Sequence, residues 1–173
     1  NLDGVQNRTS VVKDGVTTNY TSNIVNQYTT INSGSTISPT YDLNGNTLTD
    51  GTQNYAYGDN DQLLTVNGGA IATYQYDALG RRTKKMAGPT TVFYYYDGNN
   101  VIEERNASNS VQATYVYGKG EDEILSMKRG SNIYYYHSNA LGSIVAVSNA
   151  SGNTVERYEY TAFGKPTFFN GSY

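Results

Sequence analysis

Apolar and aromatic residues alternate with polar ones in short runs along the chain, and each run ends in Asp, Asn or Gly. Within residues 71–76 the alternation places Tyr74 and Tyr76 on one face of a β-strand. Residues 77–80 read Asp-Ala-Leu-Gly, which is turn chemistry, because Asp can hydrogen-bond its own backbone and Gly adopts positive φ freely. The alternation resumes over 81–86. The pattern therefore predicts a β-hairpin of about 20 residues.

The same order of strand, turn and strand is expected four more times. The predicted strand pairs are 91–96 with 101–105, 113–117 with 123–128, 133–136 with 143–147, and 155–160 with 165–169. The first 38 residues follow the pattern least regularly. The strands expected there are 8–12, 16–20, 23–28 and 36–38. The predicted fold class is all-β.

A tyrosine precedes most of the predicted turns and repeats at nearly regular spacing. These repeat anchors are Tyr41, Tyr57, Tyr76, Tyr96, Tyr117, Tyr136 and Tyr160, spaced by 16, 19, 20, 21, 19 and 24 residues. The turn residues that accompany them are Asp42, Gly45, Asp77, Gly80, Asp97, Gly98, Gly142 and Gly164. Such repetition indicates one small unit stacked many times. We expect the tyrosines to form ladders across strands, each aromatic or β-branched pair contributing about 0.2–1 kcal/mol.

The composition favours strands and weakens several functional classes. Of the 173 residues 37% are hydrophobic and 13% aromatic, with 18 Tyr and no Trp, whereas only 16% are charged. Frequent Gly, with 18 residues, disfavours helices, and the aromatic content disfavours disorder. A net charge of −3 gives no reason to expect nucleic acid or an anionic membrane as a partner. There is no Cys and no apolar run of about 20 residues, so neither disulfides nor a membrane span are expected.

Three phrases resemble the YD repeats of Rhs proteins, which also occur in teneurins and in the C subunits of insecticidal toxin complexes. They are Tyr-Gln-Tyr-Asp-Ala-Leu-Gly-Arg-Arg at 74–82, Thr-Tyr-Asp-Leu-Asn-Gly-Asn-Thr-Leu-Thr at 40–49, and the longer segment 135–164, which is similar to the Rhs-associated core. The resemblance suggests three regions. These are irregular YD-like repeats at 1–40, YD repeats at 41–134, and a core-like segment at 135–173 that stops before the family's cleavage motif.

The resemblance implies a spiral of β-hairpins, an open solenoid or shell segment that can close into a hollow shell. In toxin members of the family the shell encloses a C-terminal toxic domain, which an aspartyl self-cleavage releases inside it. Here Asn139 and Thr161 stand where the family often has Asp, and the chain ends at Tyr173. Cleavage and toxin activity are therefore assigned to no residue. The chain begins with what resembles the tail of a repeat, so we expect it to be a piece of a longer protein.

The single histidine, His137, is the one candidate for a Ser–His–Asp triad, with Ser138 or Ser143 and with Asp97 or Asp122. The Gly-x-Ser-x-Gly motif of a nucleophile elbow is absent, and a structural role is favoured.

Other charged groups also have structural interpretations. The neighbours Glu103 and Glu104 should point to opposite faces of a strand and so cannot act as an acid–base pair. The segments 42–46 and 59–61 resemble calcium loops but lack the full 12-residue pattern. The basic stretch 81–85 is interpreted as a solvated strand face. We expect no catalytic, cofactor-binding or metal-binding residues.

The favoured function is non-enzymatic. The chain would be a wall segment of an Rhs-type shell around a toxin or another passenger. The alternative is a self-assembling extracellular fibre or cell-surface adhesin, in which open repeat ends pair with further copies. Exposed tyrosines beside Asn and Thr add glycans as a candidate partner class. Either function predicts a secreted or cell-surface protein of bacterial origin.

Overall fold

The computed structural model describes residues 1–161 and 164–171 and is built almost entirely of antiparallel strands. The predicted all-β fold is confirmed. Ala162 and Phe163 of the turn expected at 161–164, together with Ser172 and Tyr173, lie outside the described residues. The chain divides into two compact units, Asn1–Pro89 and Thr90–Tyr173. Within the described part of the chain, no helix has the length and apolar character needed to cross a membrane.

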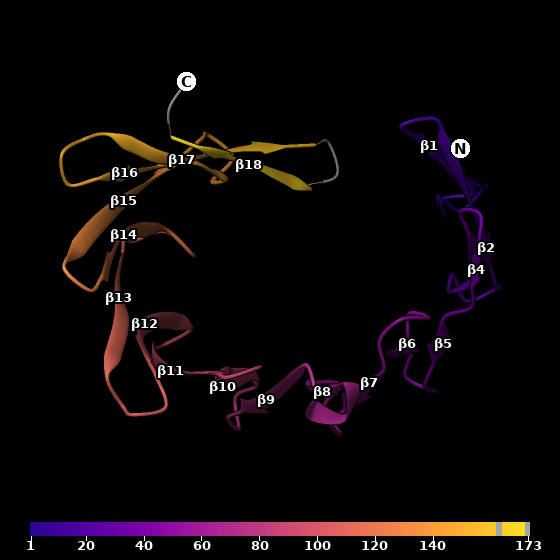
Figure 1. Cartoon of the computed structure of the whole chain (residues 1–173), viewed down its shortest axis with the longest axis horizontal. Helices are drawn as coiled ribbons and strands as arrows, with labels where there is room; N and C mark the ends of the chain where they lie inside the picture. Colours follow the sequence, from indigo (N-terminus) through magenta and orange to yellow (C-terminus); the bar gives the residue numbers. More distant parts are fainter. Residues whose placement is uncertain (162–163, 172–173) are drawn as a thin grey trace. The chain divides into compact units, whose positions relative to one another are not determined.

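The first unit contains three groups of strands, which Figure 1 shows in indigo to magenta. The first group is an antiparallel sheet in the order β1 (Ser10–Lys13), β2 (Val16–Ser22), β3 (Tyr28–Asn32) and β4 (Thr36–Ile37). The second group is the pair β5 (Thr40–Tyr41) and β6 (Thr47–Thr49). The third group runs in the order β7 (Tyr55–Tyr57), β8 (Leu63–Val66), β9 (Ala72–Tyr76) and β10 (Arg82–Ala87), with the 3-10 turn η1 (Asn67–Gly69) between β8 and β9.

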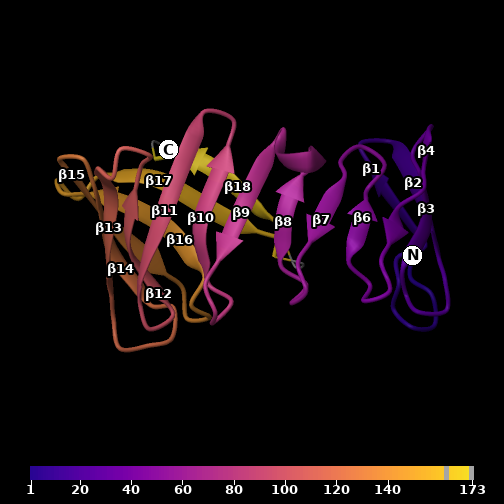
Figure 2. The ribbon, with the colours of Figure 1, turned by 90° about the horizontal axis from the view of Figure 1, so that it is seen from below.

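The second unit is a meander in which each strand pairs antiparallel with the next, as Figure 2 displays. Its strands are β11 (Thr90–Asp97), β12 (Asn100–Arg105), β13 (Val111–Tyr117), β14 (Ile124–Arg129), β15 (Asn132–Ser138), β16 (Ile144–Asn149), β17 (Thr154–Tyr160) and β18 (Pro166–Asn170). The five hairpins expected after residue 70 are all present. The expected boundaries at 40/41 and 134/135 concern repeat types and stay predictions.

One predicted strand is wrong. The segment 23–28 was expected to be extended, but β3 begins only at Tyr28. Residues 23–27 form a turn, because the side-chain Oδ1 of Asn23 accepts hydrogen bonds from the backbone N–H groups of Val25 and Gln27, each at 3.0 Å. Two β-branched residues follow Asn23 and resemble a strand in the sequence. The local Asn bonds decide the backbone instead.

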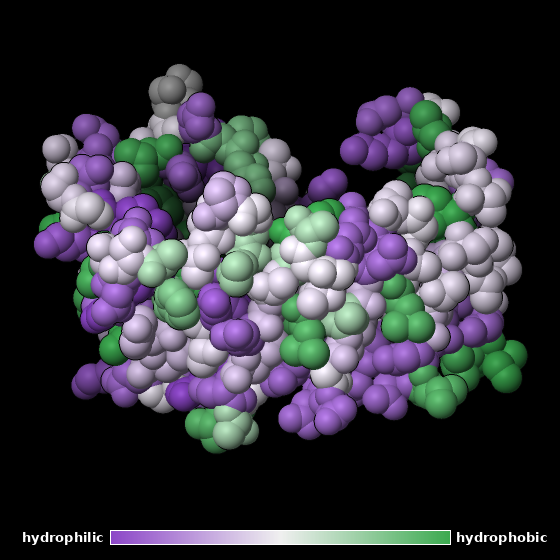
Figure 3. Space-filling view, turned by 60° about the horizontal axis from the view of Figure 1, so that its bottom comes forward, coloured by the Kyte–Doolittle hydropathy of each residue, from purple (hydrophilic) through white to green (hydrophobic). Residues whose placement is uncertain are grey.

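The sheets have two distinct faces but very little buried core. The buried apolar residues are Val66, Ala72, Ala113 and Val147. A single sheet layer leaves both faces open to solvent, so many large apolar side chains remain exposed. Figure 3 accordingly shows hydrophobic and hydrophilic residues intermixed over the visible face. Strand pairing and turns must therefore supply much of the stability that a dry core supplies in other folds.

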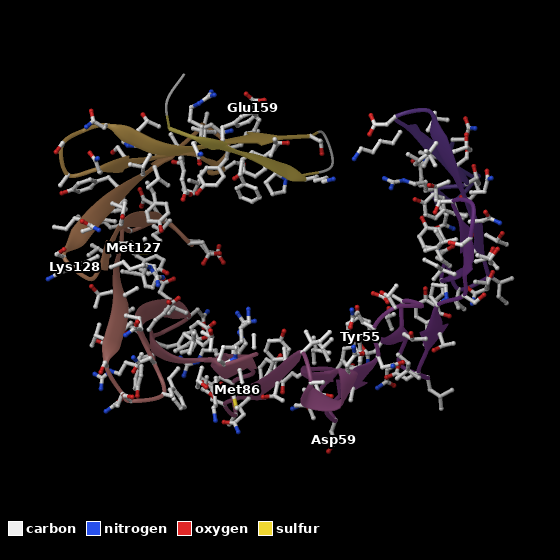
Figure 4. The ribbon with its side chains drawn as sticks, viewed as in Figure 1. Tyr55, Asp59, Met86, Met127, Lys128 and Glu159 are labelled. Carbon is white, nitrogen blue, oxygen red and sulfur yellow. The ribbon has the colours of Figure 1, made fainter. Side chains whose placement is uncertain are left out.

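Neighbouring residues of a strand alternate between the two faces. In Figure 4, Met127 and Lys128 of β14 point to opposite sides of the second unit's sheet, and Glu159 lies on the side of Lys128. The register places Tyr115, Met127 and Tyr134 side by side on the same face. We call this the tyrosine face. In the first unit the tyrosine face is the one that carries Tyr55 rather than Met86.

Candidate functional site: the tyrosine anchors and their turns

The turn after Tyr76 shows how the sequence closes a hairpin. The backbone N–H of Asp77 donates to the carbonyl of Arg81 (2.9 Å), and that of Gly80 donates to the carbonyl of Asp77 (3.0 Å). The Asp77 carboxylate accepts from the backbone N–H groups of Leu79 and Arg81, each at 2.9 Å. Gly80 has φ 83°, a left-handed conformation that a side chain disfavours. Asp at the first position and Gly at the fourth therefore fix a five-residue turn.

The same five-residue turn recurs with Asp or Asn first. Asp42 and Asn139 each accept two backbone hydrogen bonds in this manner, and Gly45 and Gly142 have positive φ at the fourth position. Four further copies were not predicted, although Asn followed three positions later by Asn or Gly marks three of them. These copies begin at Asp3, Asn23, Asn106 and Asn149. Asn139 therefore performs the turn role of the family's Asp with a neutral side chain.

Asp97 and Gly98 belong to a tighter turn than the other turn residues. Asp97 is the last residue of β11 and pairs with Asn100, so the loop is only residues 98–99. Gly98 has φ 55°, as a two-residue hairpin turn requires. Gly164, at the edge of the described residues, has φ 76° and donates its N–H to the Thr161 carbonyl.

Charge strengthens the turn at 77–81. Arg81 approaches Asp77 with both Nε and Nη2 at 2.7 Å. Burial raises the pKa of Asp77, but hydrogen bonds from the Arg81 side chain and from two backbone N–H groups outweigh it, so the net pKa is lowered. The Asn46 side chain, followed by backbone N–H groups, lowers the pKa of Asp42. The basic stretch 81–85 is thus not uniformly solvated, and Arg82 lies over the Tyr74 ring, 5.7 Å from its centroid.

Most anchors occupy the residue just before their turn and pair with a residue just after it. The pairs are Tyr41 with Thr47, Tyr57 with Leu63, Tyr76 with Arg82, Tyr117 with Ile124, and Tyr160 with Pro166. Tyr96 pairs with Val101 and lies one residue farther from its turn, because Asp97 stands between it and the loop. Tyr136 differs. It lies two residues farther from its turn, and Ser138 occupies the equivalent position opposite Ile144.

The ladders between successive hairpins are incomplete near the anchors. Strands β8 and β9 pair only through Thr65 with Thr73 and Val66 with Ala72. Toward Tyr76 the two strands separate, so the backbone carbonyl of Leu63 has no backbone hydrogen-bond partner in β9. The Tyr76 hydroxyl donates to that carbonyl at 2.8 Å. A side chain thereby replaces the missing backbone hydrogen bond.

Two other anchors make the same contact. The Tyr160 hydroxyl donates to the carbonyl of Ile144 at 2.7 Å, and the Tyr41 hydroxyl donates to that of Tyr28 at 3.1 Å. Each acceptor is the first residue of the strand that follows the preceding turn: Leu63 begins β8, Ile144 begins β16, and Tyr28 begins β3. Tyr41 thereby joins β3 to the β5–β6 pair. We call these three contacts tyrosine links.

The tyrosine ladders expected across the strands do not run from anchor to anchor. The anchors lie on alternate strands, so one strand separates each from the next and they do not pair directly. Close ring pairs involve other residues, such as Tyr20 and Tyr28, whose ring centroids are 5.1 Å apart.

The Tyr136 hydroxyl differs from those of the tyrosine links, because Tyr136 lies two residues farther from its turn. It contacts Met127 Sδ at 3.6 Å instead of a backbone carbonyl. Burial raises the pKa of Tyr76 and Tyr136 and keeps both hydroxyls protonated as donors.

A charged cluster crosses the tyrosine face of the second unit. Glu104, Ala113 and Arg129 occupy neighbouring positions on β12, β13 and β14. Arg129 Nη2 reaches over the small Ala113 side chain to Glu104 Oε2 at 3.1 Å, and the Tyr115 hydroxyl donates to Glu104 Oε1 at 2.8 Å. Glu103 instead contacts Arg105. The two glutamates thus point to opposite faces, as the alternation predicted.

The remaining candidates show no catalytic arrangement. His137 Nε2 lies 2.8 Å from Ser148 Oγ rather than beside Ser138 or Ser143, and Ser148 is only 8% exposed, which denies a substrate access to its hydroxyl. The two calcium-like segments do meet, because the side-chain amides of Asn44 and Asn46 donate to Asp61 Oδ1. Among the described residues, no group of three or more His, Cys, Asp or Glu side chains is placed to hold a metal ion.

Comparison with known proteins places these features in a family. The family model described as Teneurin YD-shell matches residues 7–167. The tRNA3(Ser)-specific nuclease WapA of Bacillus spizizenii and the tRNA nuclease WapA of Bacillus subtilis strain 168 are each 39% identical over 175 residues, covering 95% of this chain. Teneurin-1 of Mus musculus is 30% identical over 101 residues, covering 56% of the chain and 4% of that protein. The chain spans only 7% of the length of the two Bacillus relatives.

A solved structure shares the fold. The Photorhabdus luminescens Tc holotoxin pore matches with a TM-score of 0.53 and 18% sequence identity. The match covers 90% of this chain and 10% of that one.

Proposed function

Because the chain belongs to the teneurin YD-shell family, we propose that it forms a length of shell wall that encloses a toxic or unfolded passenger. Its contribution is containment, and it performs no catalysis itself. The passenger would be carried elsewhere in a longer parent protein. Two relatives are named as tRNA nucleases, which makes a nuclease the favoured class of passenger. The shell would be secreted or displayed at the surface of a bacterial cell.

The tyrosine links are the observation that carries this proposal. Where neighbouring strands separate, the backbone ladder that joins two hairpins ends, and the wall would open there. By donating to the carbonyls of Leu63, Ile144 and Tyr28, the anchor hydroxyls hold successive hairpins together across these openings and keep the wall continuous around its contents.

The test uses the full-length parent protein. We expect electron microscopy to show discrete hollow particles and expect the passenger to resist added protease until the particles are denatured. Replacing both Tyr76 and Tyr160 by Phe should increase the rate of passenger cleavage. The matched control is Tyr135→Phe, at an exposed tyrosine on the opposite face.

Two outcomes would contradict containment. One is a passenger that protease degrades as fast in the native parent as in the denatured one. The other is assembly into filaments with one copy of this segment per repeat, which would support the fibre or adhesin function instead.

A further inference from the structure

A groove lies at the ends of the strands in the second unit, between the turn that joins β14 to β15 and the turn that joins β16 to β17. Its volume is about 310 Å³. It is lined by the turn residues Ser131 and Ser151 and by the strand residues Asn132, Tyr134, Asn149 and Val155, among others. The volume falls at the lower end of the range of small-molecule sites, about 300–1,000 Å³. The groove is open to solvent, so a ligand need not displace any part of the sheet.

The strand register gathers an aromatic ring and two amides in this groove. Tyr134 of β15 pairs with Asn149 of β16. Asn132 precedes Tyr134 by two residues and therefore lies on the same face. The Oδ1 atom of Asn149 accepts the backbone N–H groups of Ser151 and Asn153, each at 3.0 Å. These bonds fix the orientation of the Asn149 amide without using its Nδ2 group.

The groove offers neutral hydrogen-bonding groups and no charge. Within residues 1–161 and 164–171, the structure gives no hydrogen-bond partner to the side chains of Ser131, Asn132 and Tyr134 or to Asn149 Nδ2. Hydroxyl and amide groups both donate and accept, and Tyr134 and Val155 add apolar surface. The other two grooves differ, because one contains Lys128 and the other Asp97, Glu121 and Asp122.

We propose that this groove binds a neutral saccharide. The apolar face of a sugar ring would pack on Tyr134, and its hydroxyl groups would exchange hydrogen bonds with Asn132, Asn149 and Ser131. The chemistry fits a sugar because each sugar hydroxyl also both donates and accepts. The nearest cation is Arg129, which lies opposite Asn132 in the register but is already paired with Glu104, so a carboxylated sugar would have to compete for it. Such a site would give the wall a recognition function in addition to containment, and containment does not depend on it.

The test is a titration of the 173-residue chain, followed by NMR, with N-acetylglucosamine, maltose and glucuronate as probes. We expect one of the two neutral sugars to shift the side-chain amide signals of Asn132 and Asn149 with a dissociation constant of about 1 mM. Glucuronate should bind more weakly. Asn132→Ala should weaken binding about tenfold, the typical effect of losing a hydrogen-bonding partner. The matched control, Asn100→Ala at the equivalent position after the two-residue turn between β11 and β12, should leave binding unchanged.

The Asn132→Asp variant keeps the side chain's size, and its backbone spectrum tests whether the fold is retained. In that variant we expect the neutral sugar to bind more weakly while the fold is unchanged. The proposal is overturned if neither neutral sugar shifts these signals, if glucuronate binds equally well, or if both Asn132 variants bind as tightly as the parent chain.

Discussion

At the scale of single residues, the most consequential group is the anchor tyrosine hydroxyl. A Phe at position 76 could make the same ring contacts but could not donate to the Leu63 carbonyl. The presence of Tyr rather than Phe at positions 41, 76 and 160 therefore has a physical reason. The ring fills space on the sheet, and its hydroxyl satisfies backbone groups that the diverging strands leave unpaired.

Removing one such hydroxyl should have a measurable cost. We expect Tyr76→Phe to lower the free energy of unfolding by about 1 kcal/mol, the net worth of a typical hydrogen bond. Urea unfolding measures this loss, and amide exchange should accelerate at the ends of β8 and β9 nearest the turns. Tyr135→Phe serves as the control and should change stability by less than about 0.5 kcal/mol. Equal losses in the two variants would show that the link does not stabilise the sheet.

At Ala113, the small size of one side chain allows the contact between Glu104 and Arg129 on the neighbouring strands. It is 1% exposed and lies beneath the contact between Arg129 and Glu104. We expect Ala113→Leu to separate those two side chains and to cost about 1–3 kcal/mol, the usual penalty of overpacking. Thermal unfolding measures the loss.

The control for Ala113 is Val116→Leu on the same strand. Val116 is 57% exposed and points to the opposite face, so the substitution should barely change the stability of the chain. If Ala113→Leu were as well tolerated as Val116→Leu, the cluster would not depend on a small residue at this position.

At the scale of elements, the five-residue turn is the unit that repeats most faithfully. The side chain of its first residue accepts hydrogen bonds from two backbone N–H groups, and its fourth residue has a left-handed backbone conformation. Both Asp and Asn serve at the first position because the two backbone hydrogen bonds need only one acceptor oxygen, while the second oxygen of Asp77 adds the contact with Arg81. The fourth position tolerates residues other than Gly, including Gln6 with φ 73°.

At the fourth position of the turn, we expect two substitutions to change the free energy of unfolding in opposite directions. Gly80→Ala should destabilise the chain by about 1–2 kcal/mol, because the left-handed backbone then carries a Cβ atom. That atom would also lie 3.2 Å from Gln62 Nε2. Gln6→Gly relieves the same backbone penalty and should stabilise by about 0.5 kcal/mol after the entropic cost of Gly. Urea unfolding of both variants tests the pair, and two changes of the same sign would contradict it.

The acidic turns predict a loss of stability in acid. The pKa values of Asp42 and Asp77 are lowered below their ordinary value of 3.8. Their contribution is therefore complete above pH 3.8 and is lost as the pH falls through the lower, folded-state values. Unfolding measured from neutral pH down to about pH 2 should show this decline. Asp77→Asn keeps the acceptor oxygen but cannot titrate, so it should flatten the decline, and an unchanged profile would exclude Asp77 as a contributor.

At the scale of the whole molecule, each unit is built of antiparallel strands and stabilised by many small contributions. With few buried residues, no single cluster dominates its stability. Repeat proteins in which each unit contacts only its neighbours have stabilities that sum local terms. Tyrosine links and five-residue turns are such local terms. This arrangement suits a wall, because it can be extended by adding hairpins without redesigning a core.

Local chemistry determined how much of this could be predicted. The hairpins after residue 70 were predictable because the alternation of each strand pair agrees with a Gly-containing turn between the two strands. The segment 23–28 was not, because β-branched Ile24 and Val25 imitate a strand while Asn23 closes a turn. The tyrosine links were also out of reach. They depend on where two ladders diverge, and that follows from register and bulges rather than from residue type.

The displaced position of Tyr136 bears on how such chains change during evolution. It lies two residues from where the other anchors lie, and it still points to the tyrosine face. A displacement of one residue would have turned it to the opposite side. A paired insertion or deletion within these strands therefore keeps the face of every following side chain, whereas a single one needs a β-bulge to restore it, such as the register shifts beside Tyr96 and Tyr117. The spacing between anchors is then free to drift over generations, while the side of the wall on which each tyrosine stands is not.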